Sequence, residues 1–139
     1  MKNNKGFTIL ELIIVIVITA ILATFAVPSI RSWRANSSLS GDTRTLKADF
    51  EFAKSRAIRD NTPITISFNT GNNSYSIDSV PPVSRSLVGT SISTNLTGAA
   101  TMTTFDSRGR PDNTGSVTLS NGSRNATVNV SMLGSIRIN

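Results

Sequence analysis

The sequence predicts an α+β fold in which one long N-terminal helix packs on an antiparallel sheet. An apolar run at 7–27 and a segment with helical spacing at 28–60 together predict the helix. The remaining residues, 61–139, are rich in Ser, Thr and Asn, and apolar and polar residues alternate there as in half-buried strands. A long helix followed only by antiparallel strands places the sheet against the apolar stripe of the helix.

The apolar run Phe7–Val27 is long enough to cross a membrane. At about 1.5 Å per helical residue it spans roughly 31 Å, which matches the ~30 Å hydrocarbon core of a bilayer. Lys2 and Lys5 precede the run, and the positive-inside rule keeps such residues on the cytoplasmic side. We therefore expect a single-pass membrane protein with a cytoplasmic N-terminus and an exported C-terminal region.

Glu11 is the only formal charge inside this run. An acidic residue at mid-bilayer costs about 2.5–3.5 kcal/mol on insertion scales, so a carboxylate in this segment needs a partner. A cleaved secretory signal has a shorter apolar region followed by a small-residue cleavage site, whereas here the small residue Gly6 precedes a longer run. An ordinary signal anchor explains the run but leaves Glu11 without a role.

The segment Lys5-Gly6-Phe7-Thr8-Ile9-Leu10-Glu11 resembles the class III signal of type IV prepilins and type II secretion pseudopilins. In that family a prepilin peptidase in the membrane cuts after the glycine and methylates the new N-terminal amine. The resemblance implies that residues 1–6 are a leader ending at Gly6, and that Phe7 is the N-methylated first residue of the mature chain. It also implies that Glu11 pairs with the N-terminal amine of a neighbouring subunit.

The composition excludes several kinds of chemistry. The chain has no cysteine and no histidine, which removes disulfides, thiol chemistry, the commonest zinc ligands and any Ser-His-Asp arrangement. Asp106 and Asp112 flank a turn but lack the loop pattern of a calcium site, so we interpret them as turn residues. We therefore predict a protein that is not an enzyme and that has no cofactor and no resident metal.

The segment after the apolar run predicts the second half of the helix, to about Asp60. Pro28 is expected to kink the helix, as proline does at this point in similar pilins, although a helix that stops there is the alternative. If Ser40-Gly41 breaks the helix, Ser40 or Asp42 would cap a second segment. The apolar stripe consists of Ile30, Trp33, Leu39, Leu46, Phe50, Ala53 and Ala57, and the opposite face carries Arg31, Arg34, Arg44, Lys47, Glu51, Lys54 and Arg59.

Alternating residues predict two hairpins and several short strands. The turn signal Asn121-Gly122 marks the second hairpin. The stretch Ser79–Ala100 is weakly patterned and predicts a loop with one edge strand. In chain order, the predicted strands are Pro63–Phe68, Tyr75–Ile77, an edge strand near Leu87–Ile92, Met102–Phe105, two strands around Val117–Leu119 and Ala126–Val130, and Ser135–Ile138.

A second segment points to one group within this family. Phe105-Asp106-Ser107-Arg108-Gly109-Arg110-Pro111 is similar to a segment of the H-type pseudopilin and FimT group of minor subunits, in which a phenylalanine is followed by a Gly-Arg-Pro-like turn. The resemblance implies the ladle-shaped pilin fold. The expected organisation is a leader at 1–6, a transmembrane and assembly helix at 7–27, an amphipathic helix at 28–60 and a globular β region at 61–139.

The resemblance also implies a mechanism of assembly. The precursor waits among the lipids of the bacterial inner membrane, is processed at Phe7, and is pulled by an inner-membrane assembly platform into a bundle with other pilin or pseudopilin subunits. Because lipid tails are about as apolar as leucine, packing and the pairing of Glu11 must direct this transfer. Pro28 lies where the helix of similar pilins loosens. A minor subunit of a type II secretion pseudopilus or type IV pilus would lie at or near the tip.

An excess of positive charge leaves a second function open. Without Lys2 and Lys5 the chain keeps a net charge of +4. Some FimT-type minor pilins of competence pili bind DNA through an arginine-bearing segment near the C-terminus. The comparable segment here, Gly134–Ile138, has a serine where a first arginine is expected, which favours solvated arginines over a DNA-binding patch. The candidate residues are Arg108, Arg110, Arg124 and Arg137, and Arg85 also lies in the sheet region.

Overall fold

The computed structural model describes residues 7–139, and the side-chain surroundings of all of these except 26–28 and 99. The chain divides into two compact units between Arg34 and Ala35. The elements are α1 (Ile9–Asp60), β1 (Ile64–Asn69), β2 (Ser74–Ile77), β3 (Val83–Ser86), β4 (Ser91–Leu96), the short 3-10 helix η1 (Thr97–Ala99), β5 (Met102–Phe105), β6 (Gly115–Ser120), β7 (Asn125–Val130) and β8 (Ile136–Ile138).

Local signals explain both ends of α1. The backbone N–H of Glu11 donates to the Thr8 hydroxyl at 3.2 Å, so Thr8 caps the first turn. At the other end Asn61 adopts a left-handed conformation (φ 48°), and the N–H of Thr62 donates to the carbonyl of Ala57 at 3.2 Å. This is the Schellman arrangement that closes many helices. The predicted end near Asp60 is confirmed.

The alternative of a helix broken at Ser40-Gly41 is excluded, because α1 continues through these residues as the main prediction of one helix to about Asp60 requires. The Asp42 carboxylate accepts a hydrogen bond from the Thr90 hydroxyl at 2.7 Å instead of capping a new segment. Buried residues on both sides, Leu39 and Leu46, hold this turn against the sheets, which outweighs the cost of about 1 kcal/mol for a glycine inside a helix. The backbone of α1 is also helical at Pro28, so the helix does not stop there, and the kink stays a prediction.

The first sheet has the order β3-β2-β1-β5, and all its pairings are antiparallel. The register of β1 and β2 pairs Ile66 with Ile77, which confirms the first predicted hairpin. β5 pairs on the other side of β1, with Phe105 opposite Ile64. The buried side chains of this sheet are Ile64, Ile66, Phe68, Tyr75, Ile77, Thr103 and Phe105.

The second sheet has the order β4-β6-β7-β8 and is also antiparallel throughout. The hairpin of β6 and β7 turns at Asn121-Gly122 as predicted, and the final strand lies within the predicted Ser135–Ile138. Asn121 accepts hydrogen bonds from the N–H groups of Ser123 and Arg124, which stabilises this turn. The buried side chains of the second sheet are Ile92, Leu96, Val117, Leu119, Val128, Val130 and Ile136.

The prediction of one edge strand near Leu87–Ile92 is wrong. The chain forms two edge strands here, β3 in the first sheet and β4 in the second, and it crosses between the sheets at 87–90. β3 contributes only the half-buried Val83 to the core, so its sequence lacks the alternation that marks a strand. The crossing divides the β region into two four-stranded sheets, both packed with the helix.

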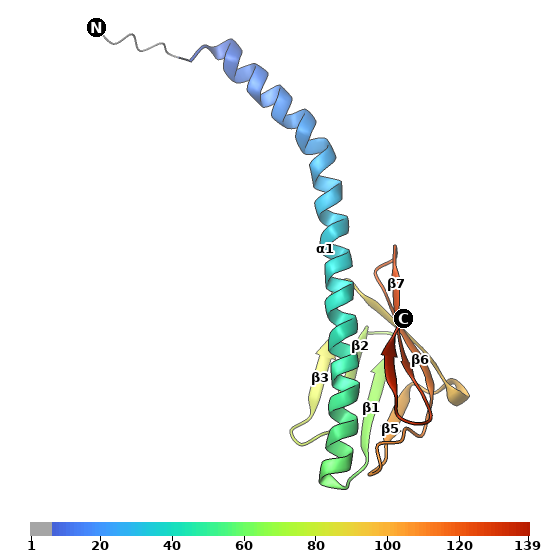
Figure 1. Cartoon of the computed structure of the whole chain (residues 1–139). Helices are drawn as coiled ribbons and strands as arrows, with labels where there is room; N and C mark the ends of the chain where they lie inside the picture. Colours follow the sequence, from blue (N-terminus) through green and yellow to red (C-terminus); the bar gives the residue numbers. More distant parts are fainter. Residues whose placement is uncertain (1–6) are drawn as a thin grey trace. The chain divides into compact units, whose positions relative to one another are not determined.

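The core lies between the second half of α1 and the sheets (Figure 1). The packing of the helix stripe on antiparallel strands was predicted, but the division of these strands into two sheets was not. The ring of Phe50 packs edge-to-face on Phe105, with ring centroids 6.2 Å apart, and tilted on Phe68 at 5.9 Å. The stripe residues in this core are Leu39, Leu46, Phe50, Ala53 and Ala57. The inclusion of Ile30 and Trp33 in the stripe is not confirmed, because these side chains are 51% and 69% exposed in the first unit.

Candidate functional site

The helix of the first unit presents apolar side chains on all its sides. From Phe7 to Phe25, the large apolar side chains are between 50% and 80% exposed. Within the described residues, α1 is the one helix with the length and composition to cross a membrane. A helix that is apolar all round needs lipid or other helices as its surroundings. This surface is therefore a candidate both for membrane insertion and for packing between subunits.

Glu11 lies in the first turn of this helix. Its backbone N–H is bound by Thr8, but its carboxylate has no hydrogen-bond or ion-pair partner among the described residues. The spacing Thr8-x-x-Glu11 is that of a capping box, but only the bond to Thr8 is formed, and the Glu11 carboxylate is stabilised by the positive end of the helix dipole. Sequence reasoning missed this local role, although the spacing makes it readable. It leaves the carboxylate free to meet a cation from another chain.

The structure describes only some of the other residues predicted to act in processing and assembly. Gly6 and the leader 1–6 lie outside the described residues. Phe7 precedes the helix and its side chain is 78% exposed, so nothing in the described structure covers the position where the mature chain would begin. Pro28 lies inside the helical backbone of α1, 17 residues after Glu11. The predicted processing sites therefore remain predictions.

In the globular unit, a buried carboxylate joins the helix to the first sheet. Asp49 of α1 is 8% exposed and accepts hydrogen bonds from the Tyr75 hydroxyl at 2.8 Å and from Nε of Arg85 at 3.2 Å. Burial and the neighbouring Asp49 carboxylate raise the pKa of Tyr75 well above its usual range, so the phenol stays a hydrogen-bond donor. Sequence reasoning missed this group, because the three residues lie far apart in the chain.

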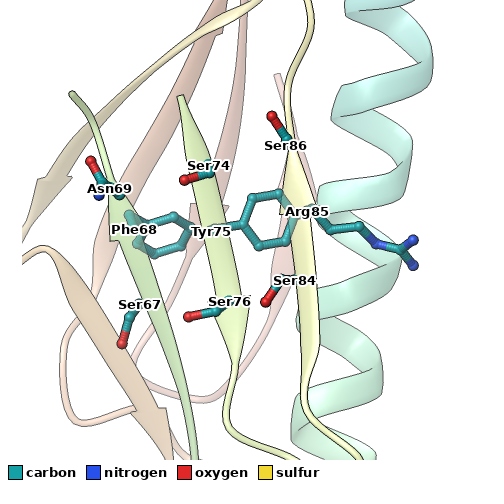
Figure 2. Close-up of a pocket in the computed structure, with 9 residues that line it drawn as sticks. All are labelled: Ser67, Phe68, Asn69, Ser74, Tyr75, Ser76, Ser84, Arg85 and Ser86. Carbon is teal, nitrogen blue, oxygen red and sulfur yellow. The ribbon is translucent and has the colours of Figure 1, made fainter. Parts of the chain in front are cut away.

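The same region of the first sheet forms a hollow on three neighbouring strands (Figure 2). Arg85 is its one charged lining residue, and its guanidinium is directed to Asp49 on α1. Hydroxyl groups dominate the rest of the lining, and no acid, base or activated nucleophile is among them. The lining residues are Ser67, Phe68, Asn69, Ser74, Tyr75, Ser76, Ser84, Arg85 and Ser86. The lining of the hollow therefore consists mainly of hydrogen-bonding groups.

The carboxylate of Asp106 builds the turn that follows β5. It accepts the backbone N–H groups of Arg108 at 2.9 Å and Arg110 at 2.8 Å, and it forms an ion pair with the Arg110 side chain at 3.2 Å. The backbone N–H of Arg110 is the main cause that holds the pKa of Asp106 below its usual value. The charge of Arg110 is therefore balanced within its own turn.

The structure does not gather the candidate arginines into one cluster among the described residues. Arg85 and Arg110 are paired with carboxylates. Arg124 precedes β7, whereas Arg137 of β8 pairs with Asn129 near the other end of β7. Five residues of nearly extended chain, or roughly 17 Å, separate Arg124 from Asn129. Arg108, Arg124 and Arg137 are exposed and have no ion pair in the described chain, which agrees with solvated single charges.

Comparison with protein families gives two matches. The family described as Type II transport protein GspH matches residues 42–134, which covers most of the globular unit. The family described as Prokaryotic N-terminal methylation motif matches residues 1–27. No curated protein sequence matches the chain.

Comparison with solved structures finds the same fold in the type IV minor pilin FimU of Pseudomonas aeruginosa. One crystal form aligns with a TM-score of 0.59 at 16% identity, over 73% of this chain and 92% of that chain. Another aligns with a TM-score of 0.60 at 17% identity, over 75% of this chain and 90% of that chain. At this level of identity, the likeness shows the fold alone and carries no residue roles.

Proposed function

The chain belongs to the GspH family of type II transport proteins, and on this premise we propose that it works as a minor subunit of a filament. The family and the methylation motif identify the chain as a minor pilin or pseudopilin of type II secretion or type IV pilus type. We further propose how the subunit is processed, which contact it makes on assembly and where it lies in the filament.

The observation that carries the proposal is the exposed apolar helix with one free carboxylate near its start. Its side chains are suited to lipid before assembly and to other helices afterwards. In the proposed pathway, prepilin peptidase cuts after Gly6 and methylates Phe7, and an inner-membrane platform moves the subunit into a bundle of similar helices. Glu11 then pairs with the N-terminal amine of a neighbouring subunit, and Pro28 gives the helix local freedom during packing.

The proposed processing and pairing predict two measurable results. Mass spectrometry of the assembled protein is expected to find an N-terminus at methylated Phe7. A Glu11→Ala variant is expected to insert in the membrane and to be processed but not to enter filaments, because its neighbour's amine would lack the carboxylate partner. Glu51→Ala removes an exposed carboxylate farther along the same helix and serves as the control. Filaments that form normally with Glu11→Ala would contradict the pairing.

We place the subunit at or near the tip, with its globular unit on the exported side of the inner membrane. Contact between different faces of successive subunits does not close and therefore produces a growing filament. The chain contains no cysteine, so Ser123→Cys in the exposed β6–β7 turn provides one site for a gold label. Label at a single filament end is expected. Label spaced along the whole filament would contradict this position.

DNA binding in a competence pilus is the alternative function. Three exposed arginines without ion pairs in the described chain support it, and their separation opposes it. Affinity for DNA by phosphate contacts falls steeply with salt, and each lost contact makes the salt dependence shallower. A gel shift at low salt that Arg137→Gln weakens, while Arg44→Gln on the helix does not, would support this function. Absence of any shift at low salt would remove it.

A further inference from the structure

Two arginines and the chain's single tryptophan follow the apolar run within four residues of one another. Arg31, Trp33 and Arg34 are all exposed in the first unit, and Trp33 is 69% exposed. Neither arginine has an ion-pair partner among the described residues. In sequence, the segment between Glu11 and Asp42 contains no acidic residue. The segment is therefore positively charged and carries one large amphipathic ring.

The charge of this segment needs an explanation, because it opposes the orientation of the chain. Lysine and arginine residues close to a membrane span favour the cytoplasmic side. Lys2 and Lys5 orient the chain in this sense, but Arg31 and Arg34 place two equal charges on the exported side. A binding partner for these arginines on that side would offset the unfavourable arrangement.

The helix length indicates where that partner lies. From Phe7, Arg31 is 24 residues and Arg34 is 27 residues along the chain, which correspond to roughly 36 Å and 40 Å of α-helix. A bilayer measures about 40–45 Å when its headgroup layers are included. If Phe7 lies at the cytoplasmic surface, both arginines reach the opposite headgroup layer, where phosphate groups are located.

The side-chain chemistry fits this layer. Guanidinium groups bind phosphate with paired hydrogen bonds, and their long stems allow the charge to reach the interface. Residues three apart lie on one helix face, so Arg31 and Arg34 can contact the same region of the bilayer surface. Tryptophan concentrates at the level of the headgroups, where its ring is partly in apolar and partly in polar surroundings.

We propose that Arg31, Trp33 and Arg34 form an anchor that binds the phosphate groups of anionic phospholipids in the outer leaflet of the inner membrane. The anchor sets the depth of the precursor and keeps the Gly6–Phe7 bond at the cytoplasmic surface, where cleavage takes place. Extraction into a filament must break these lipid contacts. The inference rests on the proposed membrane insertion of 7–27, its link to processing rests on the proposed cleavage after Gly6, and neither depends on filament assembly.

Trp33 is the only tryptophan in the chain, so its fluorescence reports the environment of the anchor directly. The full-length chain is reconstituted in vesicles of equal amounts of phosphatidylglycerol and phosphatidylcholine. A quencher at headgroup depth is attached to the anionic lipid in one sample and to the neutral lipid in the other. We expect stronger quenching by the labelled phosphatidylglycerol, corresponding to local enrichment of at least about fivefold, because each of the two arginines supplies roughly that factor near an anionic surface.

The double variant Arg31→Gln with Arg34→Gln is expected to abolish the difference between the two labelled lipids. Arg44→Gln with Lys47→Gln removes the same charge from the same helix more than a Debye length away, and it is expected to keep the difference. Flotation of each variant with the vesicles confirms insertion, and failure of insertion would overturn the membrane premise itself. Equal quenching by both lipids in the unmodified chain would overturn the anchor, as would an unchanged preference in the Arg31/Arg34 variant. The test requires no filament assembly, so its outcome is independent of that part of the proposed function.

Discussion

Two carboxylates organise much of the polar structure of the globular unit. Asp49 is buried and connects α1 to Tyr75 and Arg85 of the first sheet. Removing a carboxylate from such a group leaves its donors unpaired, which is more costly than the bond itself is stabilising. Asp106 is partly exposed and orders its own turn through backbone N–H groups. The first carboxylate fixes an edge strand to the helix, and the second shapes a loop.

Asp106 makes the stability of the chain depend on pH in the acid range. The Arg110 backbone N–H holds the pKa of Asp106 below its ordinary value of 3.8, so the stabilisation is present above about that pH and is lost as pH falls through the lower, folded value. The Asp106→Asn variant lacks this carboxylate, so its unfolding free energy is expected to fall less below that pH than the unfolding free energy of the unmodified chain. Urea denaturation at several pH values measures this difference. Arg110→Gln keeps the backbone N–H and is expected to retain most of the effect. If the unfolding free energy of Asp106→Asn and that of the unmodified chain fell equally at acid pH, this assignment would be contradicted.

The turns that follow β5 and β7 meet each other through a close backbone contact, and they meet the end of α1 through the side chains of Lys54 and Ile58. Lys54 of α1 donates to the carbonyl of Gly134 at 2.8 Å, so this lysine lies at the border of the core and not on the fully polar helix face that the sequence predicts. A side-chain carbon at Gly134 would overlap the carbonyl oxygen of Gly109, and one at Gly109 would overlap Ile58. Both glycines also have positive φ values. This junction holds the family-like segment 105–111 in place.

Three glycine substitutions separate the effect of the close contact at this junction from the effects of backbone conformation alone. Gly134→Ala combines a backbone overlap with a positive φ, and we expect it to cost more than about 2 kcal/mol of unfolding free energy. Gly122→Ala has a positive φ but open space, so a cost of about 1 kcal/mol is expected. Gly41→Ala lies in a helix with open space and is expected to stabilise by about 0.5–1 kcal/mol. Urea denaturation gives the three values, and a different rank order would contradict the packing argument.

The two units of the chain are built for different surroundings. The first unit exposes apolar side chains on all sides, whereas the second encloses a core that is complete within residues 39–136. The outward positions of the strands carry mainly Ser, Thr and Asn, which are compatible with water. A filament subunit needs this contrast, because one part must exchange lipid for helices while the other stays hydrated.

The contrast predicts that residues 35–139 fold without the rest of the chain. Every buried hydrophobic residue of the core lies in this fragment, and its size is sufficient for a single core. In buffer without detergent, the fragment is expected to elute as a monomer and to unfold cooperatively on heating, as followed by circular dichroism. The full chain under the same conditions is expected to associate through its apolar helix. Aggregation of the fragment would show that the first unit contributes to the stability of the second.

Several features of the fold could be predicted from local and periodic signals in the sequence. The membrane-length run, the position of Glu11, the end of α1 near Asp60 and the hairpin at Asn121-Gly122 each depend on residues close together in the chain. Hydrophobic spacing and turn chemistry act at this range, so they can be read without a structure. The scattered arginines also agree with the favoured interpretation of solvated charges, although their pairing was not predictable.

Contacts between distant residues determine how the weakly patterned stretch 79–100 folds. Three features depend on contacts between distant residues. They are the division into two sheets, the hydrogen bond from Arg85 of β3 to Asp49, and the continuation of α1 through Gly41. A strand with one apolar residue is stabilised by its neighbours in the sheet, and a helical glycine by the packing around it. These energies arise from residues that are far apart in sequence, and local patterns therefore contain no trace of them.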